Sequence, residues 1–278
     1  MTALSSEALK EVIEISRLFD DDGTANEVMQ ALAGTGRPMA VAPGGRGNDL
    51  ARALDIPTDP GGWAQMVMRG QTRWLDLGAA GPRRFATVAA LGFDAAVSAR
   101  AARGMAGLRG MAAYVAAAVF TLARFRPPMV DVRGADWSYQ GRILLVATGN
   151  TGMYGGGMRI APGARPDDGL FRVCLIREVS RLTVLRLIPM VIRGTHVRHP
   201  RVQLVDTPFL EIRTDPPCDI YAEGEPIGRT PMRLDVIPKA LRIIVPEGVA
   251  APSSPDSRAA MHESQVSGSK SQVVSRQG

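Results

Sequence analysis

The pattern of hydrophobic and polar positions predicts an α/β region at the start of the chain. Apolar residues recur at helical spacing over 5–19, and a second helix is expected over NEVMQALAG, after the acidic turn DDDGT. A short strand over 37–42 leads into the glycine loop PGGRGN. DLARAL begins a third helix, which IPTDP ends. Strands and loops that alternate with helices are typical of an α/β domain.

From about Trp74 the pattern changes to short apolar segments separated by glycine turns. Helical segments over 95–125 and 179–193 interrupt them, and the apolar run 111–123 is too short to cross a bilayer and is expected to be a core helix. The expected strands are WLDLGAA, FATVAALGF, GRILLVATGN, LFRVCLI, FLEIRT, CDIYAEGE and ALRIIVP. So many strands joined by turns indicate a mainly antiparallel β-rich domain.

These patterns divide the chain into three expected parts. An α/β domain over 1–73 packs on a β-rich domain over 74–249, which we expect to be an antiparallel β-sandwich. The remainder, 250–278, is polar and rich in serine, so a disordered tail is expected there. We find no internal repeats.

Composition narrows the class of protein. The chain has 278 residues, 45% of them hydrophobic and 22% charged, which is ordinary for a globular protein with a buried core. A net charge of +6 would attract anionic membranes or phosphorylated molecules. No cluster of Lys and Arg with interleaved aromatic residues is present, so nucleic-acid binding is not expected. Cys174 and Cys218 form no metal-binding spacing and are expected to be free thiols. The first residues do not resemble a signal peptide, so a cytoplasmic location is expected.

The turn with Asp22, Gly23 and Thr24 directly precedes an expected helix. The N-terminus of a helix favours phosphate, and a carboxylate there can hold Mg²⁺ or accept a proton from an attacking hydroxyl. A simple N-cap turn is the alternative, which this segment alone favours.

The loop PGGRGND follows an expected strand. Gly45 and Gly47 allow close approach of the backbone to a ligand, Arg46 could neutralise phosphate, and Asn48 could bind a nucleotide or a neighbouring loop. The alternative is a strand-to-helix turn capped by Asn48 or Asp49. The loop matches neither the P-loop nor the GxGxxG pattern.

Two further turns contain paired carboxylates. In the glycine-rich segment 149–170, Asp167 and Asp168 could supply hard oxygen ligands to Mg²⁺, with a hairpin turn as the alternative. Near the end of the β-rich region, Glu223 and Glu225 flank a glycine and could act as general base and metal ligand. A solvated turn is the alternative there.

Taken in order, these segments resemble the diacylglycerol kinase catalytic domain family, which includes bacterial lipid kinases and sphingosine and ceramide kinases and is distantly related to NAD kinases. The resemblance covers about residues 20–246. Its matching segments are DGTANEV, PGGRGNDLAR, GFDA, YGGGMRIAPGARPDDGL, EGE and PKALRIIVP.

The resemblance implies an ATP-dependent kinase that phosphorylates a lipid hydroxyl, most simply that of diacylglycerol, at the inner face of the membrane. ATP and lipid would meet between a nucleotide-binding α/β domain and a β-rich lipid-binding domain. The implied nucleotide-binding residues are Asp22, Gly23, Thr24, Gly45, Gly47 and Asn48. Asp168 would be a ligand of Mg²⁺, and Glu225 would accept the proton of the lipid hydroxyl together with Asp22. A homodimer is the default expectation.

The chain also departs from that family. Its members have further strands ahead of the GGDGT turn, so the nucleotide-binding domain is expected to be incomplete here, through truncation or a misassigned start. Asp20 and Asp21 stand in place of two glycines, Glu223 in place of an aspartate, and Thr87 in place of a common asparagine. Added carboxylates would repel phosphate. We therefore expect low or absent activity. The alternatives are a catalytically impaired nucleotide- or lipid-binding module and a kinase for a non-lipid alcohol.

Overall fold

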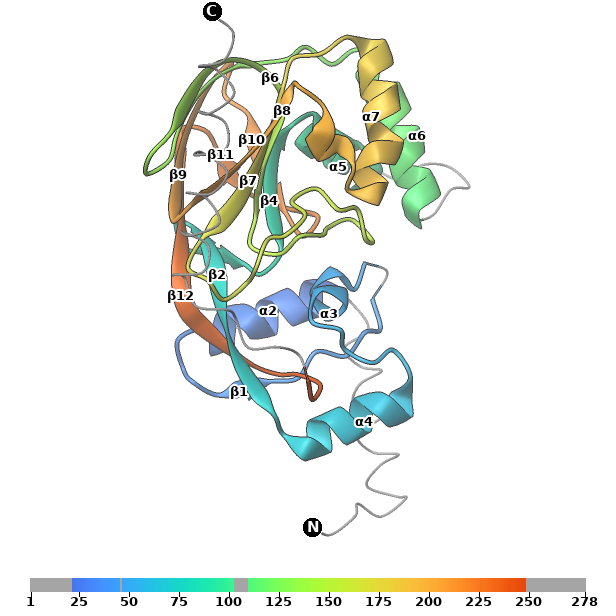
Figure 1. The fold of residues 1–278 in the computed structure, drawn as a ribbon, viewed down its shortest axis with the longest axis vertical. Coiled ribbons are helices and arrows are strands. Elements are labelled where there is room, and N and C mark those ends of the chain that lie inside the picture. Colours follow the sequence, from blue (N-terminus) through green and yellow to red (C-terminus); the bar gives the residue numbers. More distant parts are fainter. Residues whose placement is uncertain (1–21, 46, 103–109, 249–278) are drawn as a thin grey trace, which may run out of the picture. The chain divides into compact units, whose positions relative to one another are not determined.

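The computed structural model describes the backbone of residues 22–45, 47–102 and 110–248 (Figure 1). Side chains are described from Ala25 onward, except for Arg46 and residues 102–114. The helix expected over 5–19 and the tail expected over 250–278 lie outside these residues.

The first described region has the expected α/β character. Its elements are α2 (Asp22–Leu32), β1 (Pro38–Met39), α3 (Asp49–Ala53) and α4 (Pro60–Arg69). Strand β1 pairs in parallel with β12 (Met232–Ile244), so the two ends of the described chain form one sheet. A core that includes Leu54, Trp63 and Ile243 fills the space between these helices and strands.

Helix α4 was missing from the sequence-based expectation, although its signals are local. Asp59 caps the helix by accepting a hydrogen bond from the Gly62 amide at 2.7 Å. Pro60 occupies the first turn, and Gly70 ends the helix with a φ of 64°. The segment IPTDP therefore both ends the preceding helical turn and starts the next helix.

The second region is β-rich and antiparallel, as expected. Its further strands are β2 (Thr72–Ala80), β3 (Arg83–Phe85), β4 (Val88–Gly92), β5 (Met129–Arg133), β6 (Ser138–Gly149), β7 (Phe171–Arg177), β8 (Val202–Thr207), β9 (Phe209–Asp215), β10 (Asp219–Ala222) and β11 (Glu225–Arg229). The strand order is β11-β10-β4-β6-β5-β9-β12-β2-β3, with β7 beside β6 and β8 beside β7. Strands β5 and β8 were not expected from the sequence, and β3 and β11 were expected only at Phe85 and Glu225.

Strand β6 joins the two layers of the sandwich. Residues 138–142 of β6 pair with β5, whereas residues 145–149 pair with β4. Side chains from both layers meet in one core, where the rings of Phe85 and Phe171 stack with centroids 5.8 Å apart. Strands β2 and β12 contribute to this core and to that of the α/β region. The boundary at residue 74 stays a prediction.

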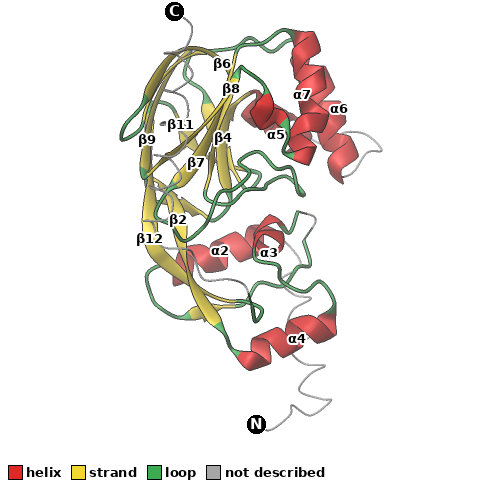
Figure 2. Cartoon of the chain, viewed as in Figure 1, coloured by secondary structure: helices red, strands yellow, loops and turns green. Residues whose placement is uncertain are grey.

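Three helices cover the outer face of the layer that contains β4, β6 and β7 (Figure 2). These are α5 (Phe93–Ala102), α6 (Gly110–Leu122) and α7 (Arg181–Arg193). Helix α6 is only partly a core helix, because Ala117, Ala118 and Leu122 are buried whereas Val119 and Phe120 are exposed. None of the described helices is long and apolar enough to span a membrane.

Candidate active site

Helix α2 begins at Asp22, so Gly23 and Thr24 lie in its first turn. The side chains of these residues lie outside the described part of the chain. Two side chains further along the helix fix its position. Gln30 donates to the Arg84 carbonyl at 2.6 Å and accepts from the Arg84 amide at 3.1 Å.

The second fixing contact of α2 involves the β10–β11 hairpin. The Glu223 carboxylate accepts hydrogen bonds from Asn26 Nδ2 at 2.5 Å, from the Ala86 amide at 2.8 Å and from the Thr87 amide at 3.1 Å. The Thr87 hydroxyl donates to the same carboxylate at 3.3 Å. Glu223 thus links the helix, the chain before β4 and the hairpin. The sequence suggested a general base or a metal ligand for this residue and did not reveal this linking role.

Glu225 lies two residues further along the hairpin and is exposed at the first position of β11. Glu223 and Gly224 form the turn with φ values of 55° and 84°. The Asn26–Glu223 hydrogen bond therefore brings the helix that begins with Asp22 to the hairpin that presents Glu225.

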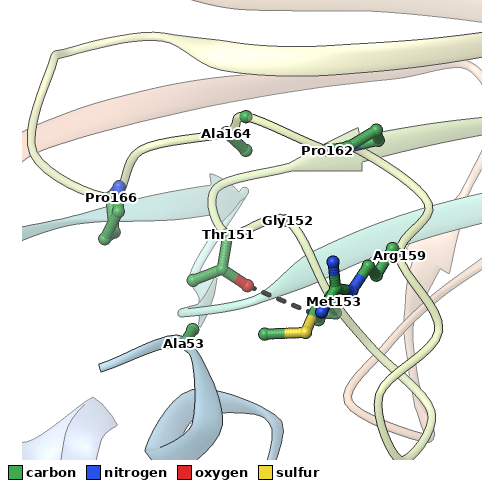
Figure 3. A pocket seen from close by; sticks show the side chains of 9 residues that line it. Ala53, Thr151, Gly152, Met153, Arg159, Pro162, Ala164 and Pro166 are labelled. Atoms are coloured by element: carbon green, nitrogen blue, oxygen red, sulfur yellow. Dashed lines mark hydrogen bonds between the residues drawn. The ribbon is translucent and has the colours of Figure 1, made fainter. Parts of the chain in front are cut away.

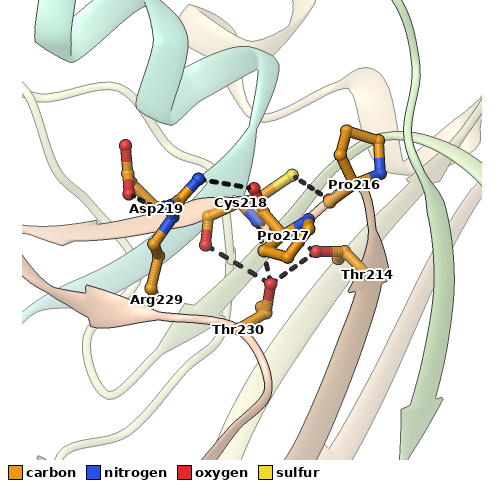
Figure 4. Close-up of polar contacts among 7 residues, drawn as sticks. All are labelled: Thr214, Pro216, Pro217, Cys218, Asp219, Arg229 and Thr230. Carbon is orange, nitrogen blue, oxygen red and sulfur yellow. Dashed lines mark hydrogen bonds and ion pairs between the residues drawn. The ribbon is translucent and has the colours of Figure 1, made fainter.

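The base of this hairpin is fastened by a compact polar network (Figure 4). The Thr214 and Thr230 hydroxyls lie 2.5 Å apart, and the Cys218 amide donates to Thr230 Oγ1 at 2.9 Å. The Thr230 amide donates to the Cys218 carbonyl at 2.9 Å. An ion pair joins Arg229 and Asp219 at 3.1 Å. These contacts fix the start of β10 to the end of β11.

The expected nucleotide loop closes on itself at Asn48. Its side-chain amide donates to the Pro43 carbonyl at 3.2 Å, and its φ of 50° is one that asparagine tolerates better than most residues. Gly45 and Gly47 lie half-buried inside this loop, and Arg46 is outside the described residues. Helix α3 starts at Asp49, directly after Asn48.

The glycine-rich segment folds onto the start of α3. The Asp49 carboxylate accepts from the amides of Gly156 at 3.1 Å and Gly157 at 2.9 Å, and Arg52 donates to the Gly156 carbonyl at 2.7 Å. The φ values of 85° and 107° at these glycines explain why glycine is required. The Tyr154 hydroxyl donates to the buried Asp94 of the GFDA segment, which ties this loop to α5 as well.

A cavity of about 230 Å³ lies between the end of α3 and the same glycine-rich segment (Figure 3). Thr151 is buried in its wall and donates a hydrogen bond to the Met153 carbonyl at 3.2 Å. The exposed Arg159 supplies a positive charge at the lining. Its full lining is Ala53, Thr151, Gly152, Met153, Arg159, Pro162, Gly163, Ala164 and Pro166.

The two neighbouring aspartates before β7 have different surroundings. Asp167 forms an ion pair with Arg73, and the Asp167 side chain is only 5% exposed. Asp168 accepts a hydrogen bond from the Leu170 amide at 3.1 Å, as expected for an aspartate in a turn. Asp168 keeps carboxylate oxygens of the kind that Mg²⁺ prefers, and Mg²⁺ is usually held by one or two carboxylates plus phosphates. Among the described residues, no group of three or more His, Cys, Asp or Glu is arranged to hold a metal ion.

Asp76 is a buried residue of this region that the sequence analysis did not single out. Its carboxylate accepts from the Gly169 amide at 2.7 Å and the Lys239 amide at 2.8 Å. Burial raises the pKa of Asp76, and the nearby Asp167 charge raises it further. A charged residue inside the apolar strand WLDLGAA was the available signal. Asn150, also buried, donates to the Asp76 and Ala86 carbonyls, both at 2.8 Å.

Two family models match the chain. Residues 21–80 match the family model of the diacylglycerol kinase catalytic domain. Residues 87–245 match the model of the YegS C-terminal NAD kinase beta sandwich-like domain. The second match covers more than half of the chain.

Similar proteins of known name point to the same family. The chain is 34% identical over 232 residues to a diacylglycerol kinase of Mycobacterium tuberculosis (strain ATCC 25618 / H37Rv), which covers 81% of this chain and 74% of that protein. It is 33% identical over 230 residues to a YegS-like lipid kinase of Pseudomonas aeruginosa (strain UCBPP-PA14), covering 82% of this chain and 75% of the relative.

The fold resembles that of a solved relative. The crystal structure of a diacylglycerol kinase from Bacillus anthracis str. Sterne matches with a TM-score of 0.62 and 17% identity, over 90% of this chain and 85% of that one. This likeness shows the fold alone. The family is shown by the two family models and by the relatives that are similar in sequence. The chain belongs to the diacylglycerol kinase family of lipid kinases.

Proposed function

We propose that this protein transfers the γ-phosphate of ATP to the hydroxyl of diacylglycerol or a closely related lipid. The observation that carries the proposal is the contact between Asn26 and Glu223, since it joins the helix that starts at Asp22 to the hairpin with Glu225. A phosphoryl transfer needs phosphate, Mg²⁺ and a base close together, and it needs no covalent enzyme intermediate.

The nucleotide would bind at the N-terminus of α2 and at the loop before α3. Backbone amides at Gly23 and Thr24 would bind the phosphate, because they lie in the first turn of α2 and the first amides of a helix have no partner within it. Gly45, Gly47 and Asn48 would shape the adjoining loop. Mg²⁺, when bound, supplies neutralisation of phosphate charge, and Asp22 and Asp168 are the carboxylates that we assign to it.

The lipid hydroxyl would lose its proton to Glu225. The hydroxyl oxygen then forms a bond to the γ-phosphorus, the bond between that phosphorus and the bridging oxygen of ATP breaks, and ADP leaves. Exposure of Glu225 at the start of β11 supports this role, because a base must reach a substrate that arrives from outside. Asp22 would assist Glu225 in this step.

The test is transfer of label from ATP to diacylglycerol dispersed in micelles with Mg²⁺. The Glu225→Gln variant removes the base and keeps the size of the side chain, so it should lose at least about two orders of magnitude in rate while nucleotide binding persists. Glu211→Gln is the matched control, because Glu211 is an exposed glutamate on β9 that pairs with Arg233. Equal rates for the wild type and the Glu225→Gln variant would refute the assignment of the base.

A catalytically impaired nucleotide- or lipid-binding module is the second candidate, and one sequence feature favours it. Asp20 and Asp21 stand where the family turn has glycines, so two carboxylates precede the phosphate site. In this case the wild type would bind nucleotide without producing a labelled lipid. Replacing both residues by glycine would then raise the affinity for nucleotide, which titration calorimetry would measure.

A further inference from the structure

The outer surface of α7 carries an apolar stripe. Leu182, Leu185 and Ile192 are 60%, 42% and 37% exposed and are spaced three and seven residues apart, which places them on one side of a helix. The opposite side holds Val184 and Leu187, which are buried in the core that joins the helices to the sheet. The exposed leucines and isoleucine are therefore not needed for packing within the described chain.

Helix α6 contacts α7 and lies beside it (Figure 1). It also exposes large apolar side chains, since Val119 is 49% and Phe120 is 58% exposed. Five of the eight large hydrophobic side chains that are exposed in the described chain belong to these two helices. We call Val119, Phe120, Leu182, Leu185 and Ile192 the α6–α7 patch. Such a concentration of apolar surface indicates an interaction site.

The charged residues within α7 and directly after α6 are all arginines. Helix α7 contains Arg181, Arg186 and Arg193, all exposed, and no acidic residue. The segment that follows α6 adds the exposed Arg124 and Arg126. Segments 119–126 and 181–193 together hold these five arginines and no Asp or Glu. The nearest acidic residue in sequence is Glu178, which precedes α7.

We infer that the α6–α7 patch docks the protein on an anionic lipid bilayer. Apolar side chains flanked by arginines are what an interfacial helix offers to the boundary between acyl chains and negative head groups. A second copy of this chain fits less well, because a symmetric interface would place the same arginines against each other. The inference rests in part on the proposed function, since a lipid substrate explains why the chain would need a bilayer.

The patch is also connected to the cavity beside α3. The Arg159 amide donates to the Val191 carbonyl at 3.1 Å, one residue before Ile192 of the patch. Arg159 itself lines the cavity. The last turn of α7 thus lies next to a residue of the cavity lining, and a bilayer bound at α7 would lie close to this cavity.

Vesicle sedimentation tests this inference with the full chain. Vesicles of phosphatidylcholine with phosphatidylglycerol should bind the protein, and pure phosphatidylcholine or high salt should weaken binding. The triple variant Leu182→Gln, Leu185→Gln, Ile192→Gln should lower partition by about tenfold or more. Met68→Gln, an exposed apolar position on α4, is the matched control and should bind as the wild type does. Unchanged vesicle binding by the folded triple variant would overturn the inference.

Two further readouts separate the outcomes. Kinase activity on a short-chain, water-dispersed diacylglycerol should be the same in the triple variant and the wild type, while activity on diacylglycerol in vesicles falls. If no kinase activity is found at all, vesicle binding still tests the patch and only the proposed function fails. If light scattering shows that the variant turns a dimer into a monomer while vesicle binding is unchanged, the patch is a self-interface and the bilayer inference is wrong.

Discussion

Replacing Glu223 by alanine is expected to release α2 from the hairpin and to destabilise the fold. The substitution leaves the Ala86 and Thr87 amides without their acceptor, and both residues are almost fully buried, at 2% and 4% exposure. A buried amide without a partner costs about 1–3 kcal/mol, so the pair is expected to cost about 2–6 kcal/mol. The φ of 55° at this position affects glutamate and alanine alike, so strain largely cancels.

Urea unfolding followed by tryptophan fluorescence measures this change. A loss of about 2–6 kcal/mol corresponds to a fall in the melting temperature of about 4–24 °C for a chain of this size. Glu211→Ala is the control, because its carboxylate makes an exposed ion pair with Arg233, and exposed pairs contribute about 0–1 kcal/mol. A free energy of unfolding for Glu223→Ala within about 0.5 kcal/mol of the wild type would refute the view that this carboxylate holds the site together.

Three further predictions concern other buried groups. Thr230→Val removes the hydroxyl shared by Thr214 and the Cys218 amide and should cost about 1–2 kcal/mol in urea unfolding; no loss would contradict the role of this network. The pKa of folded Asp76 is raised above its ordinary value of 3.8, so its contribution to stability is fully present below pH 3.8 and falls as pH rises through the raised pKa. The free energy of unfolding of the wild type minus that of Asp76→Asn should therefore fall over that range, and a rise would contradict the raised pKa. Burial raises the pKa of the Cys174 thiol to about 12, so a thiol reagent should label the half-buried Cys218 first and Cys174 only on unfolding; early labelling of Cys174 would show that the core opens.

The sequence predicted the fold where the signals are local. Apolar runs bounded by glycine predicted the longer strands, and their number predicted a β-rich antiparallel region. Strands β5 and β8 were missed because each is short and mixes charged or polar residues with its apolar ones, so that only Val130 and Val132 are buried in β5 and only Thr207 in β8. The exposure of Val119 and Phe120 was missed because an apolar run predicts a buried helix, and only the positions of neighbouring elements show which of its sides stays exposed.

The candidate site was predictable only in part, for a related reason. The turns that carry the family motifs could be found because each has a distinctive composition. The hydrogen bonds that link these turns join residues that lie far apart in the sequence. Glu223 joins residues more than a hundred positions away, and Asp49 binds a glycine segment equally distant in sequence. No local pattern reveals such pairs. The assigned roles of Asp22, Asp168 and Glu225 in catalysis stay predictions.

The most direct test of the central claim is a count of labelled phospholipid formed from labelled ATP and diacylglycerol by the wild-type chain and by Glu225→Gln. The account predicts a labelled phosphatidate with the wild type, at a low rate because Asp20 and Asp21 replace the glycines of the family turn, and loss of that product in the variant with nucleotide binding retained. Absence of product from a folded wild-type chain that binds nucleotide, or equal product from both proteins, would contradict it.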